Sequence, residues 1–129
     1  MTLIDTSAWI EFLRKGGDAA VKSRVAALIE FEEAAYCGPV KFELLTGARP
    51  AEVGDLVIAL GFASLLEFPL ACWERAAEME RALRSKGVTV PRDDVFVAAA
   101  ALHHGTLLYA ADGHFELMRQ RGGFELRLV

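Results

Sequence analysis

The chain has 129 residues, of which 53% are hydrophobic and 25% are charged, and its formal net charge at pH 7 is −4. This composition is typical of a globular protein and excludes an intrinsically disordered chain. The length predicts a single domain over residues 1–129. The negative charge argues against a protein that coats long stretches of nucleic acid, because such proteins present a basic face. The negative charge does not exclude an enzyme whose bound cations neutralise both its own acids and a phosphate.

Membrane and export signals are not expected in this sequence. No apolar run reaches the roughly 20 residues that a membrane-spanning helix needs, and Asp5 interrupts the N-terminal apolar stretch that a signal peptide would require. Cys37 and Cys72 lack CxxC spacing, and such thiols are more often buried small hydrophobic groups than a disulfide. We therefore expect a cytoplasmic protein that does not bind a membrane.

The first half of the chain alternates expected strands with expected helices. Residues 2–5 predict a short buried strand, after which Thr6 or Ser7 can cap a helix that Gly16 and Gly17 end. The apolar spacing then predicts a helix, a strand, a helix and another helix, over residues 18–33, 34–38, 39–46 and 51–61.

The second half of the chain continues this alternation. Its elements are expected in the order strand, helix, helix, strand, helix and strand, over residues 63–69, 70–86, 93–104, 106–110, 113–121 and 124–129. Residues 93–104 are apolar almost all round, which predicts a helix buried on more than one side. Strands separated by helices imply a parallel sheet with helices on both faces. The expected fold is therefore a three-layer α/β/α sandwich with a mainly parallel central sheet.

Five acidic residues occur where such a sheet gathers functional groups. Asp5 ends the first strand, and Asp112 follows the penultimate one. Both therefore lie at the carboxyl ends of strands, outside which open α/β sheets bind their ligands. Asp93 and Asp94 begin the apolar helix, and Glu43 lies one turn inside an earlier helix between two apolar residues. These acids are the candidate site residues.

Most of these acids also have an ordinary structural explanation when each is taken alone. Asp93 or Asp94 would cap a helix and favour its positive end. Glu43 would be a solvated acid, and Asp112 would belong to a turn. Asp5 is the hardest to explain in this way, because hydroxyl residues that can cap the next helix directly follow it.

Taken together, the acids favour a metal site. Clustered carboxylates repel one another, and each has its pKa raised unless a positive charge lies among them. Oxygen ligands without an accompanying set of Cys or His select Mg²⁺ or Mn²⁺. Such ions activate water and stabilise the charge that develops in phosphoryl displacement. A carboxylate-lined metal site without a nucleotide-binding loop is typical of phosphodiester hydrolysis.

Three segments of the chain match a known family in their order: LIDTSAWIEFL, VKFELLTGA and VPRDDVFVAAAALHHGTLLYAADGHFELM. They resemble the PIN-domain ribonucleases, particularly the VapC-type toxins of bacterial toxin–antitoxin pairs, over nearly the whole chain. The resemblance assigns Asp5, Glu43, Asp94 and Asp112 to the acidic site. Asp94 is preferred to Asp93 because its spacing to the apolar helix follows the family pattern, and Asp93 would then be the helix cap.

The resemblance implies a Mg²⁺-dependent endoribonuclease, with Mn²⁺ as an alternative ion, that is inhibited by a cognate VapB-type antitoxin. Asp5 and Asp94 would hold the main ion, Asp112 would complete its shell, and Glu43 would orient a water or a second ion. Ala110 replaces the usual Thr or Ser of the family. In addition, His114 replaces a frequent further Asp, which leaves the site with one acid fewer.

The resemblance also implies a homodimer, because VapC-type toxins commonly dimerise. Trp9, Phe12 and the apolar face of residues 51–61 are candidates for that contact or for the antitoxin contact.

Other enzymes and regulators of this fold class match the sequence less well. An aspartyl-phosphate phosphohydrolase needs a second Asp two residues after the first, where Ser7 stands. A response-regulator receiver needs an Asp after a middle strand, and LLEFP offers none. A non-catalytic RNA-binding or protein-binding module of the same fold is the alternative to the ribonuclease.

Overall fold

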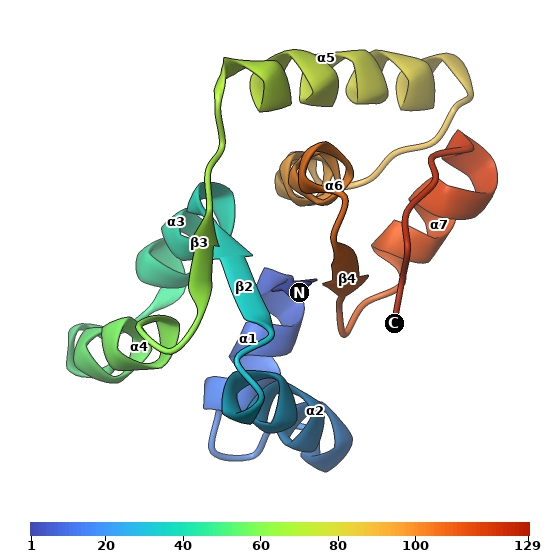
Figure 1. Cartoon of the computed structure of the whole chain (residues 1–129). Helices are drawn as coiled ribbons and strands as arrows, with labels where there is room; N and C mark the ends of the chain where they lie inside the picture. The colour runs from blue at the N-terminus through green and yellow to red at the C-terminus, as the bar shows by residue number, and fades with distance from the viewer.

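Four short strands form one parallel sheet in the computed structural model, which describes residues 1–129 (Figure 1). Their order across the sheet is β3-β2-β1-β4. Their bounds are β1 Thr2–Ile4, β2 Ala34–Cys37, β3 Ser64–Leu66 and β4 Leu107–Tyr109. The chain leaves β1 to form β2 and β3 on one side of it, whereas β4 pairs with the other side. The order of the strands thus changes direction at β1 and β4, the kind of point where open α/β sheets bind ligands.

Seven α-helices and one short 3₁₀-helix connect the strands. Their bounds are α1 Thr6–Leu13, α2 Ala19–Glu30, α3 Gly38–Gly47, η1 Pro50–Glu52, α4 Val53–Leu60, α5 Leu70–Ser85, α6 Arg92–His104 and α7 His114–Gly122. α1 packs on α2, and α5 packs on α6, at opposite ends of the view in Figure 1. The expected three-layer α/β/α sandwich with a parallel sheet is confirmed.

Helix α6 is the most deeply buried helix. All but one of the residues from Asp94 to Ala101 are buried, and the helix packs against α3, α5, α7 and β4. Its apolar sequence predicts this burial on several sides. Gly105 ends the helix with a left-handed φ of 64°, which glycine adopts without steric cost.

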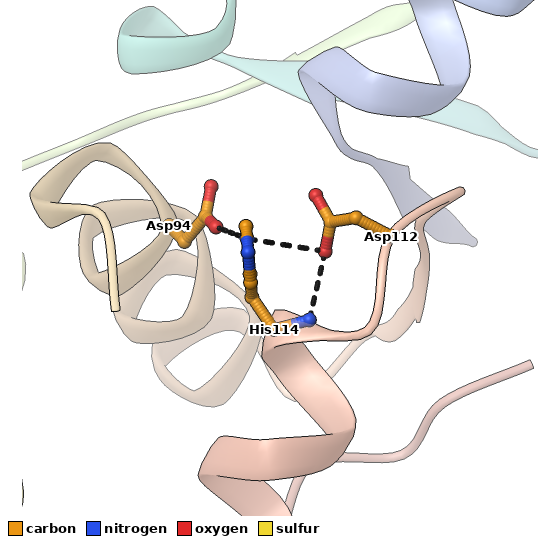
Figure 2. A group of neighbouring side chains, drawn as sticks. All are labelled: Asp94, Asp112 and His114. Atoms are coloured by element: carbon orange, nitrogen blue, oxygen red, sulfur yellow. Dashed lines mark hydrogen bonds and ion pairs between the residues drawn. The ribbon is translucent and has the colours of Figure 1, made fainter. Parts of the chain in front are cut away.

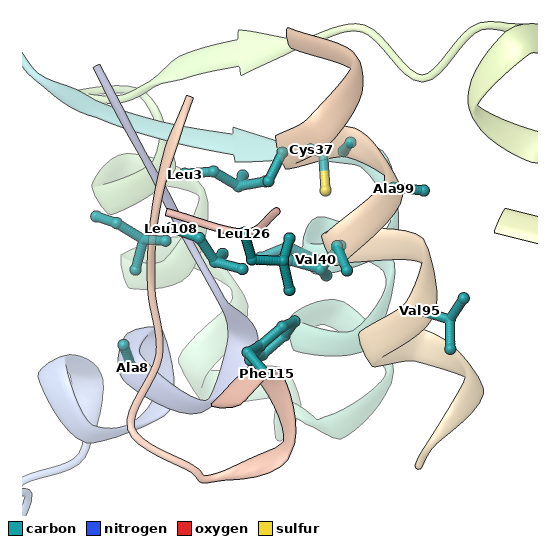
Figure 3. Packing of buried hydrophobic residues seen from close by; sticks show 14 of the residues in the cluster. Leu3, Ala8, Cys37, Val40, Val95, Ala99, Leu108, Phe115 and Leu126 are labelled. Carbon is teal, nitrogen blue, oxygen red and sulfur yellow. The ribbon is translucent and has the colours of Figure 1, made fainter. Parts of the chain in front are cut away.

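The hydrophobic core joins the sheet to the helices that carry the acids. Leu3 of β1 and Leu108 of β4 pack with Val40 of α3, Ala99 of α6 and Phe115 of α7 (Figure 3). Each of these side chains is at most 1% exposed. Because Asp94 and His114 belong to the same helices, this packing fixes the positions of the candidate site residues.

Several expected element boundaries differ from the structure. α1 ends at Leu13, before the two glycines that were expected to end it. Gly17 is instead required by a close approach, since a Cβ there would lie 1.8 Å from the carbonyl oxygen of Glu11. The expected helix over 51–61 is divided between η1 and the shorter α4.

The prediction of a final strand over residues 124–129 is wrong, because this segment does not form a full strand. The segment makes one parallel bridge, between Leu108 and Leu128, with hydrogen bonds from Leu108 N to Arg127 O at 2.9 Å and from Val129 N to Leu108 O at 3.1 Å. Strand β4 is only three residues long, so it offers a short ladder to any further strand.

Trp9 is not available for contact with another molecule. Its side chain is 0% exposed and packs edge-to-face against Phe12, with ring centroids 6.1 Å apart. The expectation that Trp9 contacts a partner is therefore wrong, whereas Val57 and Ile58 of α4 are exposed. None of the helices is both long and apolar enough to cross a bilayer.

The role of Phe115 in the core leads to a first prediction. Phe115→Ala is expected to lower the free energy of unfolding by about 3 to 5 kcal/mol, because it removes a buried ring and leaves a cavity between α7 and the sheet. Phe31→Ala is the matched control, since Phe31 is 72% exposed, and about 0.5 kcal/mol or less is expected. Urea unfolding of both variants measures this difference, and equal losses would contradict the assignment of Phe115 to the core.

Candidate metal centre

Asp5 is held by the first turn of α1, at the end of β1. Its side chain is 1% exposed, and its Oδ2 accepts hydrogen bonds from the Ser7 backbone N–H at 3.0 Å and the Ser7 hydroxyl at 2.7 Å. Asp5 is itself the N-cap of α1, so the expectation that Thr6 or Ser7 caps this helix is wrong. Its other oxygen, Oδ1, is buried without a hydrogen-bond partner.

Ser7 connects the two loops that carry Asp5 and Asp112. While its hydroxyl donates to Asp5, its oxygen accepts a hydrogen bond from the backbone N–H of Ala111 at 2.9 Å. The backbone N–H of Asp5 donates to the carbonyl of Tyr109 at 2.9 Å, which continues the pairing of β1 with β4. The sequence analysis did not assign this role to Ser7. The available signal for this role was the position of Ser7, two residues after an aspartate that ends a strand and precedes a helix.

Asp94, Asp112 and His114 form the second part of the cluster (Figure 2). The Nδ1 of His114 lies 2.6 Å from Asp94 Oδ2 and 3.5 Å from Asp112 Oδ1. The backbone N–H of His114 also donates to Asp112 Oδ1 at 3.0 Å, so one loop positions both residues. Figure 2 shows the imidazole ring between the two carboxylates, which come from α6 and from the loop before α7.

Glu43 reaches the cluster from α3. The Thr6 hydroxyl donates to its Oε1 at 2.8 Å. Burial raises the pKa of Glu43 to about 7, and the carboxylates of Asp93, Asp5 and Asp94 raise it further while the bond from Thr6 opposes them. In the metal-free chain, these surroundings favour the protonated form of Glu43 more than those of a surface acid would.

Asp5 and Asp94 of the cluster also have raised pKa values. Burial raises the pKa of Asp5, against the hydrogen bonds from Ser7, and the charge of Asp112 adds to the rise. Burial raises the pKa of Asp94 to about 6, with further upward contributions from Asp5 and Asp112 and an opposing one from His114. Burial is the main cause of both shifts, and repulsion between the carboxylates adds to it.

The structure distinguishes the neighbours Asp93 and Asp94. Asp94 is 7% exposed and contacts His114. Asp93 is half-buried and acts on the cluster through its charge, which raises the pKa of Glu43. The expectation that Asp93 caps α6 is wrong, because Pro91 occupies that position and no side chain caps the helix. The helix begins at Arg92, one residue before the expected start.

The residues present fit a divalent cation. Each of Asp94, Asp112 and His114 offers one ligand atom, and these three atoms lie within 4.8 Å of one another. The unpartnered Oδ1 of Asp5 is a further candidate ligand, because a buried carboxylate oxygen without a donor is costly unless a cation binds it. The carboxylate oxygens of this set are ligands that Mg²⁺ and Mn²⁺ prefer.

The comparison with known proteins identifies the family. The family model described as PIN domain matches residues 2–120. Ribonuclease VapC11 of Mycobacterium tuberculosis is 35% identical to this chain over 122 residues, which are 92% of this chain and 91% of that protein. This chain belongs to the PIN-domain family, in its VapC group. The resemblance of the three sequence segments is thereby confirmed.

Solved structures of this family share the fold. DNA-bound VapBC from Salmonella typhimurium has a TM-score of 0.81 at 16% identity, over 99% of this chain and 96% of that chain. A toxin–antitoxin complex from Klebsiella pneumoniae has a TM-score of 0.76 at 16% identity, over 100% of this chain and 96% of that chain. At these identities the likeness concerns the fold, and it agrees with the observed three-layer PIN architecture.

The raised pKa values lead to a prediction for the metal-free protein. An acid with a raised pKa binds its proton more tightly in the folded chain, so stability is lost as the pH rises from its unfolded pKa towards its folded pKa. For Asp94 and Glu43, whose folded pKa values are about 6 and about 7, unfolding in chelator should become easier between about pH 4 and pH 7. The expected loss is on the order of 1 to 2 kcal/mol, allowing for solvent screening.

Glu43→Gln tests this assignment because glutamine keeps an acceptor for Thr6. The variant should be more stable than the wild type at pH 8 and nearly equal to it at pH 4.5, measured as thermal melting in chelator. Glu74→Gln is the control, since Glu74 is exposed on α5. An unchanged pH profile in Glu43→Gln would show that Glu43 ionises as an ordinary surface acid.

Proposed function

We propose that this PIN-domain protein is a metal-dependent endoribonuclease that acts as the toxin of a toxin–antitoxin pair. The observation that carries the proposal is the meeting of Asp5, Glu43, Asp94 and Asp112 beside the carboxyl ends of β1 and β4, with Asp5 Oδ1 buried and unpartnered. The name of the relative VapC11, a ribonuclease, supports the same activity. We infer that residues 1–129 form one nuclease domain, and that it acts on RNA in the cytoplasm.

Asp5, Asp94 and Asp112 are the proposed ligands of the ion, Mg²⁺ or Mn²⁺. When bound, such an ion lowers the pKa of a coordinated water and stabilises negative charge on the scissile phosphate. The combined negative charge of the three carboxylates would also repel free anions. A phosphate would therefore enter the site only together with a cation. Ser7 holds Asp5 Oδ2, so that the free Oδ1 has a fixed position.

Glu43 is the proposed proton acceptor of the reaction. Thr6 occupies its Oε1, and this bond orients the carboxyl so that Oε2 can accept a hydrogen bond from a water. A carboxylate in this position can take up a proton from that water.

The alternative function is a non-catalytic RNA-binding or protein-binding module of the same fold. The two functions differ in one observable property. A nuclease cleaves a structured RNA when Mg²⁺ or Mn²⁺ is added and stops when a chelator removes the ion. A binding module retains the RNA intact under both conditions.

The third prediction concerns Asp5→Asn and Asp94→Asn. Both variants should lose RNA cleavage by roughly 100-fold or more, because each removes a proposed ion ligand. Asparagine can still cap α1 at position 5 and still accept a hydrogen bond from His114 at position 94, so both variants should fold. Initial cleavage rates and melting temperatures should be measured together, beside Glu74→Gln at an exposed acid of α5.

Cleavage at the wild-type rate by either aspartate variant would contradict the assignment of that acid to the ion. Unfolding of a variant would show that the acid stabilises the fold, and cleavage by the wild type in chelator would contradict the dependence on metal.

The proposed protein partner is a VapB-type antitoxin that neutralises the toxin. Several proteins of the same fold were solved as toxin–antitoxin complexes, including the one from Klebsiella pneumoniae. No lysine or arginine of this chain pairs with the clustered acids, whose only basic neighbour is His114. A basic side chain of the antitoxin can supply that charge, and the planar fork of arginine binds carboxylates in pairs.

The fourth prediction is that inhibition by the cognate antitoxin weakens with salt and on loss of Asp94. Screening reduces the attraction between an arginine and the acids, and Asp94→Asn removes one acceptor charge. Because that variant is expected not to cleave RNA, its affinity should be measured by calorimetry rather than by inhibition. Equal affinity at low and high salt for both proteins would indicate binding to a surface away from the cluster.

A homodimer is the proposed assembly state. Phe42 of α3 and Val57 and Ile58 of α4 are 48 to 66% exposed, and α3 packs against α4. Exposed apolar side chains on neighbouring helices are typical of protein interfaces. Sedimentation of wild type and Ile58→Asp tests whether this surface makes the dimer.

A further inference from the structure

His114 lies inside the acidic cluster, although the acids alone are the proposed ligands of the ion. Its Nδ1 is 2.6 Å from Asp94 Oδ2 and 3.5 Å from Asp112 Oδ1. It is the first residue of α7, and its backbone N–H is bound to Asp112 at 3.0 Å. The next residue, Phe115, is 1% exposed in the core. The backbone of His114 is therefore held on both sides, and its ring faces the cluster (Figure 2).

The three candidate ligand atoms lie within 4.8 Å of one another, a spacing compatible with ligands around one ion. Ligand atoms at about 2.1 Å from a common octahedral ion lie about 3 Å from their nearest neighbours. The separations of 2.6 and 3.5 Å from His114 Nδ1 to the two carboxylate oxygens lie on either side of this value. The His114 nitrogen that lies 2.6 Å from Asp94 Oδ2 is placed to bind an ion beside that carboxylate.

A second observation concerns the charge of the cluster. The Oδ1 of Asp5 is buried and has no hydrogen-bond donor. No lysine or arginine pairs with these acids, so His114 is the only basic group of this chain beside them. A single imidazole cannot balance four carboxylates, which makes a divalent ion the expected occupant.

The chemistry of an imidazole ligand determines which ion is favoured. Mg²⁺ takes hard oxygen ligands almost exclusively, whereas Mn²⁺ accepts oxygen ligands and nitrogen ligands together. We propose that His114 coordinates the divalent ion through its ring nitrogen, beside Asp94 and Asp112, and that this ligand makes the centre favour Mn²⁺ over Mg²⁺. The proposal rests on the proposed metal-dependent function.

The nitrogen of an imidazole bound to Mn²⁺ is directly observable, independently of any activity. Pulsed electron paramagnetic resonance detects the coupling of Mn²⁺ to a coordinated ¹⁴N nucleus. The chain has three histidines. His103 and His104 lie at the opposite end of α6 from Asp94, and ten helical residues correspond to about 15 Å. His104 Nε2 also lies 2.7 Å from the carbonyl oxygen of Glu67. A nitrogen coupling would therefore identify His114.

The experiment compares the wild-type chain with His114→Asp and the control His104→Ala, each loaded with Mn²⁺. Wild type and His104→Ala should show the nitrogen coupling, and His114→Asp should lose it while still binding Mn²⁺. Calorimetry should show that His114→Asp binds Mg²⁺ about tenfold more tightly than wild type, with a smaller change for Mn²⁺. Aspartate in the first turn of a helix is favourable, so this variant should fold. His114→Asn, which removes the imidazole ring and keeps the approximate size, is the second variant.

Three results overturn the proposal. The first is bound Mn²⁺ without a nitrogen coupling in the wild type, and the second is a coupling that persists in His114→Asp. The third is tighter binding of both ions by His114→Asn, which would mean that the ring competes with the ion. If Asp5→Asn still abolishes Mn²⁺ binding in these cases, the proposed function stands without His114. Failure of the wild type to bind either ion overturns the proposed metal-dependent function as well.

Discussion

The pairing of β1 with β4 is the constraint on which the rest of the site depends. Ile4 pairs with Tyr109 at the end of both strands, and the next residue of the first loop, Asp5, donates its backbone N–H to Tyr109. The loops that follow then diverge from the same point, one into α1 and the other towards α7. Two acids more than a hundred positions apart in sequence therefore face one another. No local preference of either loop would achieve this placement.

The buried acids lower the stability of the fold, and the packing of the hydrophobic core compensates for this loss. The pKa values of Asp5, Glu43 and Asp94 are all raised, with burial as the largest cause in each case. A buried carboxylate cluster opposes folding unless it is protonated or bound to a cation. The close packing of α6 and α7 on the sheet offsets this opposition and keeps the acids together. Enzymes commonly combine a tightly packed core with a functional site that lowers their stability.

The sequence predicted the layers well because they follow from simple periodicities, and it predicted where the acids lie relative to the strand ends. The apolar run of α6 and the alternation of strands and helices fixed the fold class, and Asp5 and Asp112 were marked by their places after buried strands. Asp94 was chosen over Asp93 only through the family resemblance. The structure adds a physical reason for the difference, since one side chain contacts His114 and its neighbour acts only through its charge.

Other features depended on contacts that no local pattern encodes. The Ser7 link between two loops joins residues 104 positions apart. The burial of Trp9 depends on how α1 packs, because an apolar residue on a short helix can belong either to the core or to an interface. The final segment has the alternation of a strand, yet β4 is too short to pair with much of it. Each of these outcomes was determined by tertiary neighbours rather than by propensity.

The link through Ser7 also limits how Asp5 can act as a ligand. Two donors from Ser7 occupy Oδ2, whereas Oδ1 has no donor. If Asp5 holds the proposed ion, it would therefore offer one ligand atom rather than two. A carboxylate restricted in this way would leave more positions of the ion for water and for a phosphate oxygen. The hydroxyl of Ser7 would thereby influence how many exchangeable positions the centre retains.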